Sequence, residues 1–236
     1  MSRWLRVRLL LDRLAAAVAL VLVSPLIGVL VWLVRRHDGG PGLITVPRMG
    51  RAGVVFGMWK IRSMRAESSD GRAQGPSLTS GEDRRITPIG QRLRRLHLDE
   101  LPQLLNVVRG EMALLGPRPE APDFVDLDDP RWTSVLRVPP GIAGPTQLVV
   151  ADWERELITA DPDGSVYREV VLPVKLAIDA WYVRAATPRL DVLVADTLAR
   201  QGLSDDRLGV LCRRVSEEVP EAAEPVGWMK ARQPGD

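Results

Sequence analysis

The chain has 236 residues, with 32 lysines and arginines against 30 aspartates and glutamates, so its formal net charge is only +2. Such a balance does not indicate a nucleic-acid-binding protein. The single cysteine, Cys212, excludes an internal disulfide framework, and the two histidines leave no Cys/His metal cluster. A metal site would have to use carboxylates, which favours a hard ion such as Mg²⁺. The length suits one domain with short extensions.

The first apolar run is long enough to cross a bilayer. Residues 14–34 carry no charge over about 21 positions, the length that spans the hydrocarbon core. Ser24 and Pro25 interrupt this run near its middle, and a proline inside a helix removes a backbone donor and bends or breaks the helix. Basic residues lie on both sides, and they are Arg3, Arg6, Arg8, Arg13, Arg35 and Arg36. Since such residues stay on the cytoplasmic side, we expect a re-entrant helix, broken at Ser24-Pro25, with both ends in the cytoplasm.

Two other interpretations fit the same run. One is a single membrane span with a proline kink. The other is a cleaved signal peptide, which fits less well because the apolar core is long, Asp12 lies in the basic region and no small-residue cleavage site follows.

Two short β-prone runs follow, at residues 42–46 and 53–59. The second is followed by Lys60 and Arg62, and the alternation of a strand places both side chains on one side, where they can face one phosphate. Residues 67–83 are rich in serine, glycine and charge, and we expect a mobile loop there.

An acidic pair, Asp99-Glu100, comes at the predicted start of a helix. Thr87 and Pro88 form an N-cap and first position for the helix before it. Carboxylates at a helix N-terminus can act as simple caps worth about 0.5–2 kcal/mol. Four cations in nearby segments, however, are candidate phosphate ligands, namely Lys60, Arg62, Arg94 and Arg118. A carboxylate beside cations stays ionised and is available as a nucleophile or metal ligand.

The rest of the chain reads as a rigid corner, two helices and a tail. Prolines on both sides of Arg118 fix its backbone direction, which suits an anion contact. Residues 165–184 and 190–203 have helical patterns, either for core packing or for lying in the membrane interface. The tail from Ser216 is acidic and then rich in proline and glycine, which predicts disorder.

Several long motifs in a fixed order carry a family resemblance. They are Leu11-Asp12, Ser24-Pro25, Arg48-x-Gly50-x-x-Gly53, Lys60-x-Arg62-Ser63-Met64, Leu98-Asp99-Glu100-Leu101-Pro102-Gln103-Leu104, Asn106-Val107-Val108-x-Gly110-Glu111-Met112, Gly116-Pro117-Arg118-Pro119, Pro140-Gly141-Ile142-x-Gly144, Asp179-x-x-Tyr182 and Leu190-Asp191. Together they resemble the bacterial sugar transferase family, the monotopic phosphoglycosyl transferases, over most of the chain.

The resemblance implies an α+β fold that is mostly helical. We expect a re-entrant membrane helix in residues 1–38 and a catalytic domain in residues 39–215, with short strands and interfacial amphipathic helices. Residues 216–236 would be the disordered tail. The implied location is the inner (plasma) membrane, with the catalytic domain on its cytoplasmic face.

The resemblance also implies a two-step, Mg²⁺-dependent reaction. Asp99 would attack the sugar-side phosphate of a UDP-sugar, release UMP and hold the phosphosugar until a polyprenyl phosphate takes it. Asp99 and Glu100 would be the catalytic residues and the metal ligands. The implied substrate-binding residues are Lys60, Arg62, Arg94, Pro117, Arg118 and Gln147.

Other features leave alternatives open. Residues 143–152 depart from the way in which the family usually continues the Pro140-Gly141-Ile142 motif, although Gln147 is retained. The identity of the transferred sugar therefore cannot be read from the residues. A catalytically weakened relative that acts as a membrane scaffold in glycan assembly is the alternative function. Nucleic acid is not an expected partner, and a homodimer is a further option.

Overall fold

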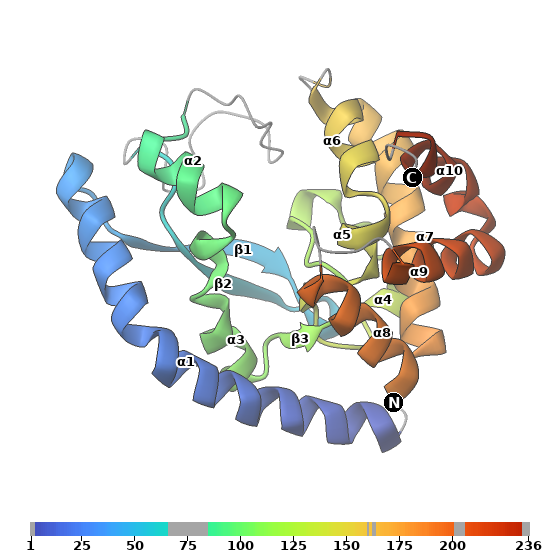
Figure 1. Ribbon diagram of the computed structural model, residues 1–236, viewed down its shortest axis with the longest axis horizontal. Coiled ribbons are helices and arrows are strands. Elements are labelled where there is room, and N and C mark those ends of the chain that lie inside the picture. The colour runs from blue at the N-terminus through green and yellow to red at the C-terminus, as the bar shows by residue number, and fades with distance from the viewer. Residues whose placement is uncertain (1–2, 66–84, 160, 162–163, 201–205, 233–236) are drawn as a thin grey trace.

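The computed structural model describes residues 3–65, 85–159, 161, 164–200 and 206–232. Figure 1 shows a long helix, α1, along one side of the molecule, with a β-hairpin, α2 and α3 beside it and the C-terminal helices gathered at the other end. The predicted loop at residues 67–83 lies outside the described residues. Helices dominate and the strands are short, as expected for a mostly helical α+β chain.

Helix α1 (Arg3–Asp38) runs for 36 residues and has Pro25 inside it. The expected break at Ser24-Pro25 is therefore wrong: the helix continues through both residues, and its ribbon bends (Figure 1). The Ser24 hydroxyl donates to the Val21 carbonyl at 2.9 Å. That carbonyl is the acceptor that Pro25, lacking an N–H, leaves without its backbone donor, so the serine lowers the cost of the proline.

Most of the apolar surface of α1 is not buried by the fold. Among the described residues it is the one helix long and apolar enough to cross a membrane, with a mean hydropathy of 2.7 over its best 18-residue window. Only 6% of that window is buried, whereas the core helix of a soluble protein would be mostly buried. Its large exposed side chains include Leu14, Val21, Leu22 and Trp32. A bilayer would cover this surface.

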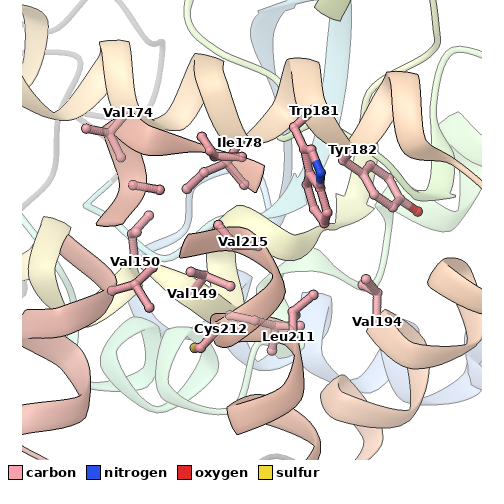
Figure 2. Close-up of a cluster of buried hydrophobic side chains, with 14 of the residues drawn as sticks. Val149, Val150, Val174, Ile178, Trp181, Tyr182, Val194, Leu211, Cys212 and Val215 are labelled. Carbon is pink, nitrogen blue, oxygen red and sulfur yellow. The ribbon is translucent and has the colours of Figure 1, made fainter. Parts of the chain in front are cut away.

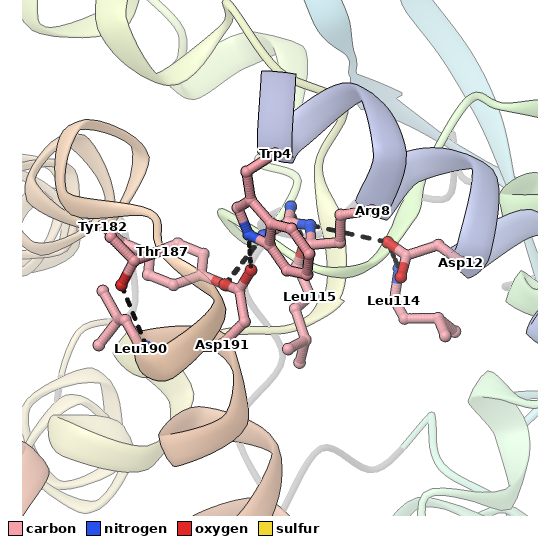
Figure 3. A network of polar contacts seen from close by, with 9 residues as sticks. All are labelled: Trp4, Arg8, Asp12, Leu114, Leu115, Tyr182, Thr187, Leu190 and Asp191. Carbon is pink, nitrogen blue, oxygen red and sulfur yellow. Dashed lines mark hydrogen bonds and ion pairs between the residues drawn. The ribbon is translucent and has the colours of Figure 1, made fainter. Parts of the chain in front are cut away.

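Polar side chains near the start of α1 attach it to the rest of the chain (Figure 3). Arg8 Nη2 donates to the Leu115 carbonyl at 2.9 Å, and Asp12 Oδ2 accepts from the Leu114 amide at 3.2 Å. Both of these backbone groups belong to strand β3 (Ala113–Leu115). Arg8 Nη1 also lies 3.0 Å from Asp191 Oδ1, in α8 (Pro188–Ala199). Helix α1 is thus joined directly to the strand that leads into the Gly116-Pro117-Arg118 corner.

The first two predicted strands are confirmed as an antiparallel hairpin, β1 (Leu43–Met49) and β2 (Val55–Ile61), with the 3₁₀ turn Arg51–Gly53 at its tip. Strand β3 pairs in parallel with β4 (Gly141–Ala143). Helix α3 (Gln103–Arg109) holds the hairpin through one buried side chain. The Asn106 side chain accepts from the Trp59 amide at 3.0 Å and donates to the Gly57 carbonyl at 2.9 Å.

The C-terminal half is a helical unit around its own core (Figure 2). It consists of α4 (Pro130–Val135), α5 (Pro145–Val149), α6 (Ala151–Thr159), the π-helical turn Tyr167–Val171, α7 (Leu172–Ala185), α8, α9 (Asp206–Glu218) and α10 (Ala223–Arg232). Ile178 and Trp181 of α7 pack in this core with Val149 and Leu211. The predicted helix at residues 165–184 is therefore a core helix.

The prediction of a disordered tail from Ser216 onward is wrong as far as Arg232. Helix α9 continues to Glu218, the turn Pro220–Ala222 follows, and α10 ends at Arg232. Val219, Ala222 and Val226 are at most 3% exposed and belong to the core cluster. A few well-spaced apolar side chains are enough to dock an otherwise polar segment.

Candidate active site

The acidic pair lies in a short turn between two helices. Helix α2 (Pro88–Arg95) begins with the predicted Thr87 cap, whose hydroxyl accepts from the Gly90 amide at 2.9 Å. His97 then takes a left-handed conformation, with φ at 53°, and redirects the chain. Asp99 and Glu100 follow in the 3₁₀ turn Leu98–Glu100, just before α3. The prediction that both carboxylates lie at the start of a helical segment is confirmed.

Two cations from distant parts of the chain meet this pair. Lys60 Nζ, at the end of β2, lies 3.1 Å from Glu100 Oε1 and 3.6 Å from Asp99 Oδ2. Arg118 Nη2 lies 2.8 Å from the same Glu100 oxygen. The side chains of Asp99 and Glu100 are 6% and 13% exposed, whereas those of Lys60 and Arg118 are 21% and 31% exposed. The cations therefore lie between the carboxylates and solvent, where an anionic ligand can reach them.

The electrostatics keep Glu100 ionised. Burial by itself would raise the pKa of Glu100, but Arg118 and Lys60 outweigh that effect and hold the pKa well below its usual range. In turn Glu100 raises the pKa of Arg118 against the opposing effect of burial. The site therefore holds an ionised Glu100 against the Arg118 guanidinium, beside Asp99 and Lys60, an arrangement that suits phosphate chemistry.

The backbone fixes both cations in place. Lys60 directly follows Trp59, whose amide is held by Asn106 of α3. Arg118 follows the closest approach of β3 and β4, where a Cβ on Gly116 would lie only 2.8 Å from the Gly141 amide nitrogen. The Pro117 carbonyl accepts from that amide at 2.7 Å. Arg118 is thus aimed at the acidic pair by a strand pair that tolerates no side chain at either glycine.

Arg62, a predicted phosphate ligand, is not brought to the acidic pair. Its side chain is fully buried and forms an ion pair with Asp38 at the end of α1. It also donates to the Pro41 carbonyl at 2.6 Å and to the Met64 carbonyl at 3.2 Å. The expectation that Lys60 and Arg62 face one phosphate is thus not met in this structure, because a nearer carboxylate and two carbonyls engage Arg62. In this structure Arg62 holds the end of α1.

The remaining predicted ligands lie around the site with other contacts. Arg94 Nε donates to the Ser63 hydroxyl at 2.8 Å. The Gln147 side chain accepts from the Gly144 amide at 2.9 Å and so caps the start of α5. Pro117 is buried at the β3–β4 corner. Their roles in substrate binding stay predictions.

A pocket adjoins the acidic pair and contains residues to which the sequence analysis assigned no role in a site. Lys60 and Arg118 line one part of it, and the others include Arg48, Glu120, Tyr167 and Lys175. Lys175 is the sole charged residue between Leu172 and Ile178 in an otherwise apolar helical run, and its side chain is only 7% exposed. An isolated lysine in a core-facing pattern is a sequence signal that could have identified this cluster.

Metal binding at the pair is chemically reasonable. Among the described residues, no group of three or more Asp, Glu, His or Cys side chains could hold an ion by itself. Asp99 and Glu100 nevertheless offer two adjacent carboxylates. Mg²⁺ is commonly bound by one or two carboxylates together with substrate phosphates and water, so the pair fits the ion expected from the sequence.

Comparison with known proteins agrees with the geometry. Residues 3–201 match the family model described as bacterial sugar transferase. The undecaprenyl-phosphate glucose phosphotransferase of Komagataeibacter xylinus is 36% identical over 189 residues, which is 78% of this chain and 33% of that protein. The UDP-N-acetylgalactosamine-undecaprenyl-phosphate N-acetylgalactosaminephosphotransferase of Aeromonas hydrophila is 35% identical over 187 residues, which is 78% of this chain and 40% of that protein.

A third relative is covered over a larger share of its length. The UDP-glucose:undecaprenyl-phosphate glucose-1-phosphate transferase of Caulobacter vibrioides is 36% identical over 165 residues, which is 65% of this chain and 60% of that protein. The chain thus spans between a third and three fifths of the length of these relatives. The matched part includes the acidic pair, both cations that contact it and helix α1. The chain belongs to the bacterial sugar transferase family.

Proposed function

We propose that the chain transfers a phosphosugar from a UDP-sugar to a polyprenyl phosphate and so forms a polyprenyl-diphosphate-linked sugar that begins the assembly of a glycan. The observation that carries this proposal is the buried Asp99-Glu100 pair held against Lys60 and Arg118. The names of the relatives support the same acceptor and, for two of them, a UDP-linked donor.

Asp99 is the better nucleophile of the two carboxylates. Glu100 engages both cations at short distances, whereas Asp99 has one cation at 3.6 Å. In the first step an Asp99 oxygen attacks the sugar-bearing phosphorus, and the bond from that phosphorus to the oxygen bridging to UMP breaks. The electron pair stays on UMP, and the phosphosugar is held on Asp99.

In the second step the acceptor completes the transfer. An oxygen of the polyprenyl phosphate attacks the phosphorus held on Asp99, and the Asp99 carboxylate leaves as an anion. Lys60 and Arg118 neutralise the charge that develops on the phosphate oxygens in both steps. Mg²⁺ bound by Asp99 and Glu100 would supply further neutralisation of the diphosphate.

The membrane places the acceptor within reach. The phosphate of a polyprenyl phosphate lies at headgroup depth, and α1 anchors the site in the same layer through its exposed apolar surface. We place the catalytic domain on the cytoplasmic face of the inner membrane, because arginines flank the apolar run of α1 on both sides.

The test is a UMP-release assay with a panel of UDP-sugars, a polyprenyl phosphate and Mg²⁺. We expect release with at least one UDP-sugar and no measurable turnover by the isosteric variant Asp99→Asn, which removes the nucleophile without changing its shape. The exposed Asp128→Asn serves as the matched control and should keep full activity.

Without the acceptor, intact-mass measurement of the wild type should show one phosphosugar added, and peptide mapping should locate it at Asp99. Normal UMP release by the folded Asp99→Asn variant would overturn the assignment of the nucleophile. Absence of UMP release by the wild type across the whole panel would overturn the proposed function.

A further inference from the structure

Four basic residues line the pocket beside the acidic pair, and one of them, Arg48, differs from the others in its contacts. Lys60 and Arg118 contact Glu100, and Lys175 contacts acidic groups of its own. Arg48, on β1, lines the same pocket. A cation that a carboxylate of the pocket already neutralises has little capacity left for an anionic ligand.

The acidic groups of the pocket already have their cation. Lys175 Nζ lies 2.9 Å from Glu120 Oε1 and 3.0 Å from Glu154 Oε1. The Tyr167 hydroxyl donates to Glu120 Oε2 at 2.7 Å. These contacts lower the pKa of Glu120 although burial opposes them. Lys175 is therefore a structural counter-ion, which leaves it little capacity for a ligand.

Arg48 has no such partner. Its guanidinium makes no hydrogen bond and no ion pair with any residue in the part of the chain that the structure describes. Burial and the like charge of Arg118 lower the pKa of Arg48, and Glu120 only partly opposes them. A partly desolvated cation without a bonded anion is unfavourable unless something else supplies the anion.

The backbone holds Arg48 at the pocket. Arg48 pairs with Phe56 in the hairpin register, and the next amide, that of Met49, donates to the Glu120 carbonyl at 2.9 Å. The strand is thereby fastened to the segment that follows Arg118. The unpaired guanidinium is therefore part of a fixed wall of the pocket.

The in-line geometry of phosphoryl transfer indicates which phosphate of the donor would contact Arg48. In phosphoryl transfer the attacking and leaving oxygens lie roughly in line on opposite sides of the phosphorus. If Asp99 attacks a phosphate held by Lys60 and Arg118, the leaving group lies on the side away from Asp99. The pocket extends from these two cations to Arg48, and neither Asp99 nor Glu100 lines it.

We propose that Arg48 is a donor-binding residue that contacts the phosphate leaving with the nucleotide, so that this pocket binds the diphosphate of a nucleoside diphosphate sugar. The inference rests on the proposed function and extends it to a residue with no role so far. Arg48 would stabilise the charge gained by the UMP phosphate as its bond to the sugar-bearing phosphorus breaks.

The reaction is expected to be of the two-step, ping-pong type, which allows a sharp test. In such a reaction kcat/KM for the donor depends only on the first half-reaction, and kcat/KM for the acceptor only on the second. We expect Arg48→Gln to lower kcat/KM for the UDP-sugar by about 10- to 100-fold, the usual effect of losing a charged hydrogen bond. The value for the polyprenyl phosphate should stay unchanged, because UMP has already left. Arg48→Lys should recover part of the loss.

Direct binding of UMP gives a second readout that needs no turnover. We expect Arg48→Gln to weaken the calorimetric affinity for UMP by a similar factor, and Arg51→Gln, an exposed arginine in the same hairpin, to leave it unchanged. Inorganic phosphate should compete with UMP in the wild type and lose most of this effect in Arg48→Gln.

Two results would overturn the inference while leaving the proposed function intact. One is an equal fall in kcat/KM for donor and acceptor together with unchanged UMP affinity, which would make Arg48 a structural residue. The other is a loss that depends on the sugar of the donor while UMP affinity stays the same, which would mean that the sugar occupies the pocket. Failure of the proposed function itself would look different, since the wild type would then release no UMP.

Discussion

Asp99 and Glu100 carry the same charge one residue apart, yet their surroundings separate their roles. Glu100 shares one oxygen between Lys60 and Arg118, so both cations are held at a fixed distance from the turn. Asp99 is more deeply buried than Glu100, and its cation is farther away. A carboxylate that is less tightly paired with cations keeps its oxygens more available for attack. The adjacent glutamate is what holds the cations ready for the substrate.

The pairing of Glu100 makes a prediction about stability and pH. Its pKa is lowered in the folded chain, so its ionised form stabilises the fold above about pH 4.3, the pKa in the unfolded chain. This contribution is lost as the pH falls from that value toward the folded-state pKa. The Tm values of wild type and Glu100→Gln should therefore differ by a constant amount above about pH 5, and the difference should shrink progressively as the pH falls below about 4. A gap in Tm that stays constant over the whole range, as for an uncharged packing change, would contradict this role.

Arg62 shows where residue-level reasoning from the sequence failed. Strand alternation predicted a second cation for the substrate, but the carboxylate that engages Arg62 is 24 positions earlier, at the end of α1. No local pattern reveals a partner that only the folded chain brings near. Lys60 and Arg118 do reach the acidic pair, as the family motifs around them indicated, while their role in substrate binding stays a prediction.

The buried ion pair gives Arg62 a distinct mutational signature. Arg62→Gln removes the fully buried guanidinium from the ion pair with Asp38, whose own side chain is 23% exposed, and loss of such a charged hydrogen bond costs about 1.5–3 kcal/mol. We expect a large fall in the free energy of unfolding, with a much smaller further loss when Asp38→Asn is added, so that a double-mutant cycle shows strong coupling. If Arg62→Gln instead unfolds like wild type and only kcat/KM for the UDP-sugar falls, Arg62 is a substrate ligand after all.

At the scale of elements, the sequence predicted best where local chemistry decides the structure. The Thr87 cap, the two hairpin strands and the core helix at residues 165–184 all follow from capping, alternation and periodicity. Two predictions failed because a contact with another part of the chain outweighed the local sequence signal. The Ser24 hydroxyl lets α1 continue through Pro25, and the helical core binds the tail that composition alone indicated to be disordered.

The docked tail can be tested by truncation. Ending the chain after Ser216 removes Val219, Ala222 and Val226 from the core. Two buried valines alone contribute about 3 kcal/mol, which corresponds to a fall of about 6–12 °C in Tm for a chain of this size. Deleting only residues 233–236 is the matched control and should leave Tm unchanged. An unchanged Tm after the longer truncation would show that α10 contributes nothing to the core.

At the scale of the whole molecule, the fold buries one set of apolar side chains, and a bilayer would cover another set. The C-terminal helices enclose their own core, whereas α1 leaves most of its apolar side chains exposed while its polar groups, Arg8 and Asp12, hold β3. With α1 in the bilayer, as proposed above, its depth would set the height of the β3–β4 corner and of Arg118. The proposed anchor and the proposed active site would then depend on the same contacts.

The bend of α1 makes the last prediction, which concerns topology. A straight helix of 36 residues would be roughly 54 Å long at 1.5 Å per residue, enough to cross a hydrocarbon core of about 30 Å. Arginines on both sides of its apolar run favour a path that returns to the cytoplasm. Single cysteines at Ser2, His37 and Glu217 in a Cys212→Ala background should all react with an impermeant maleimide only after the cells are permeabilised. Pro25→Leu restores the backbone donor to the Val21 carbonyl and favours a straight span, so the Ser2 site should become partly reactive from outside. Labelling of Ser2 and Glu217 from opposite sides in the unaltered helix would instead show that α1 crosses the membrane once and that its bend has no part in bringing the chain back.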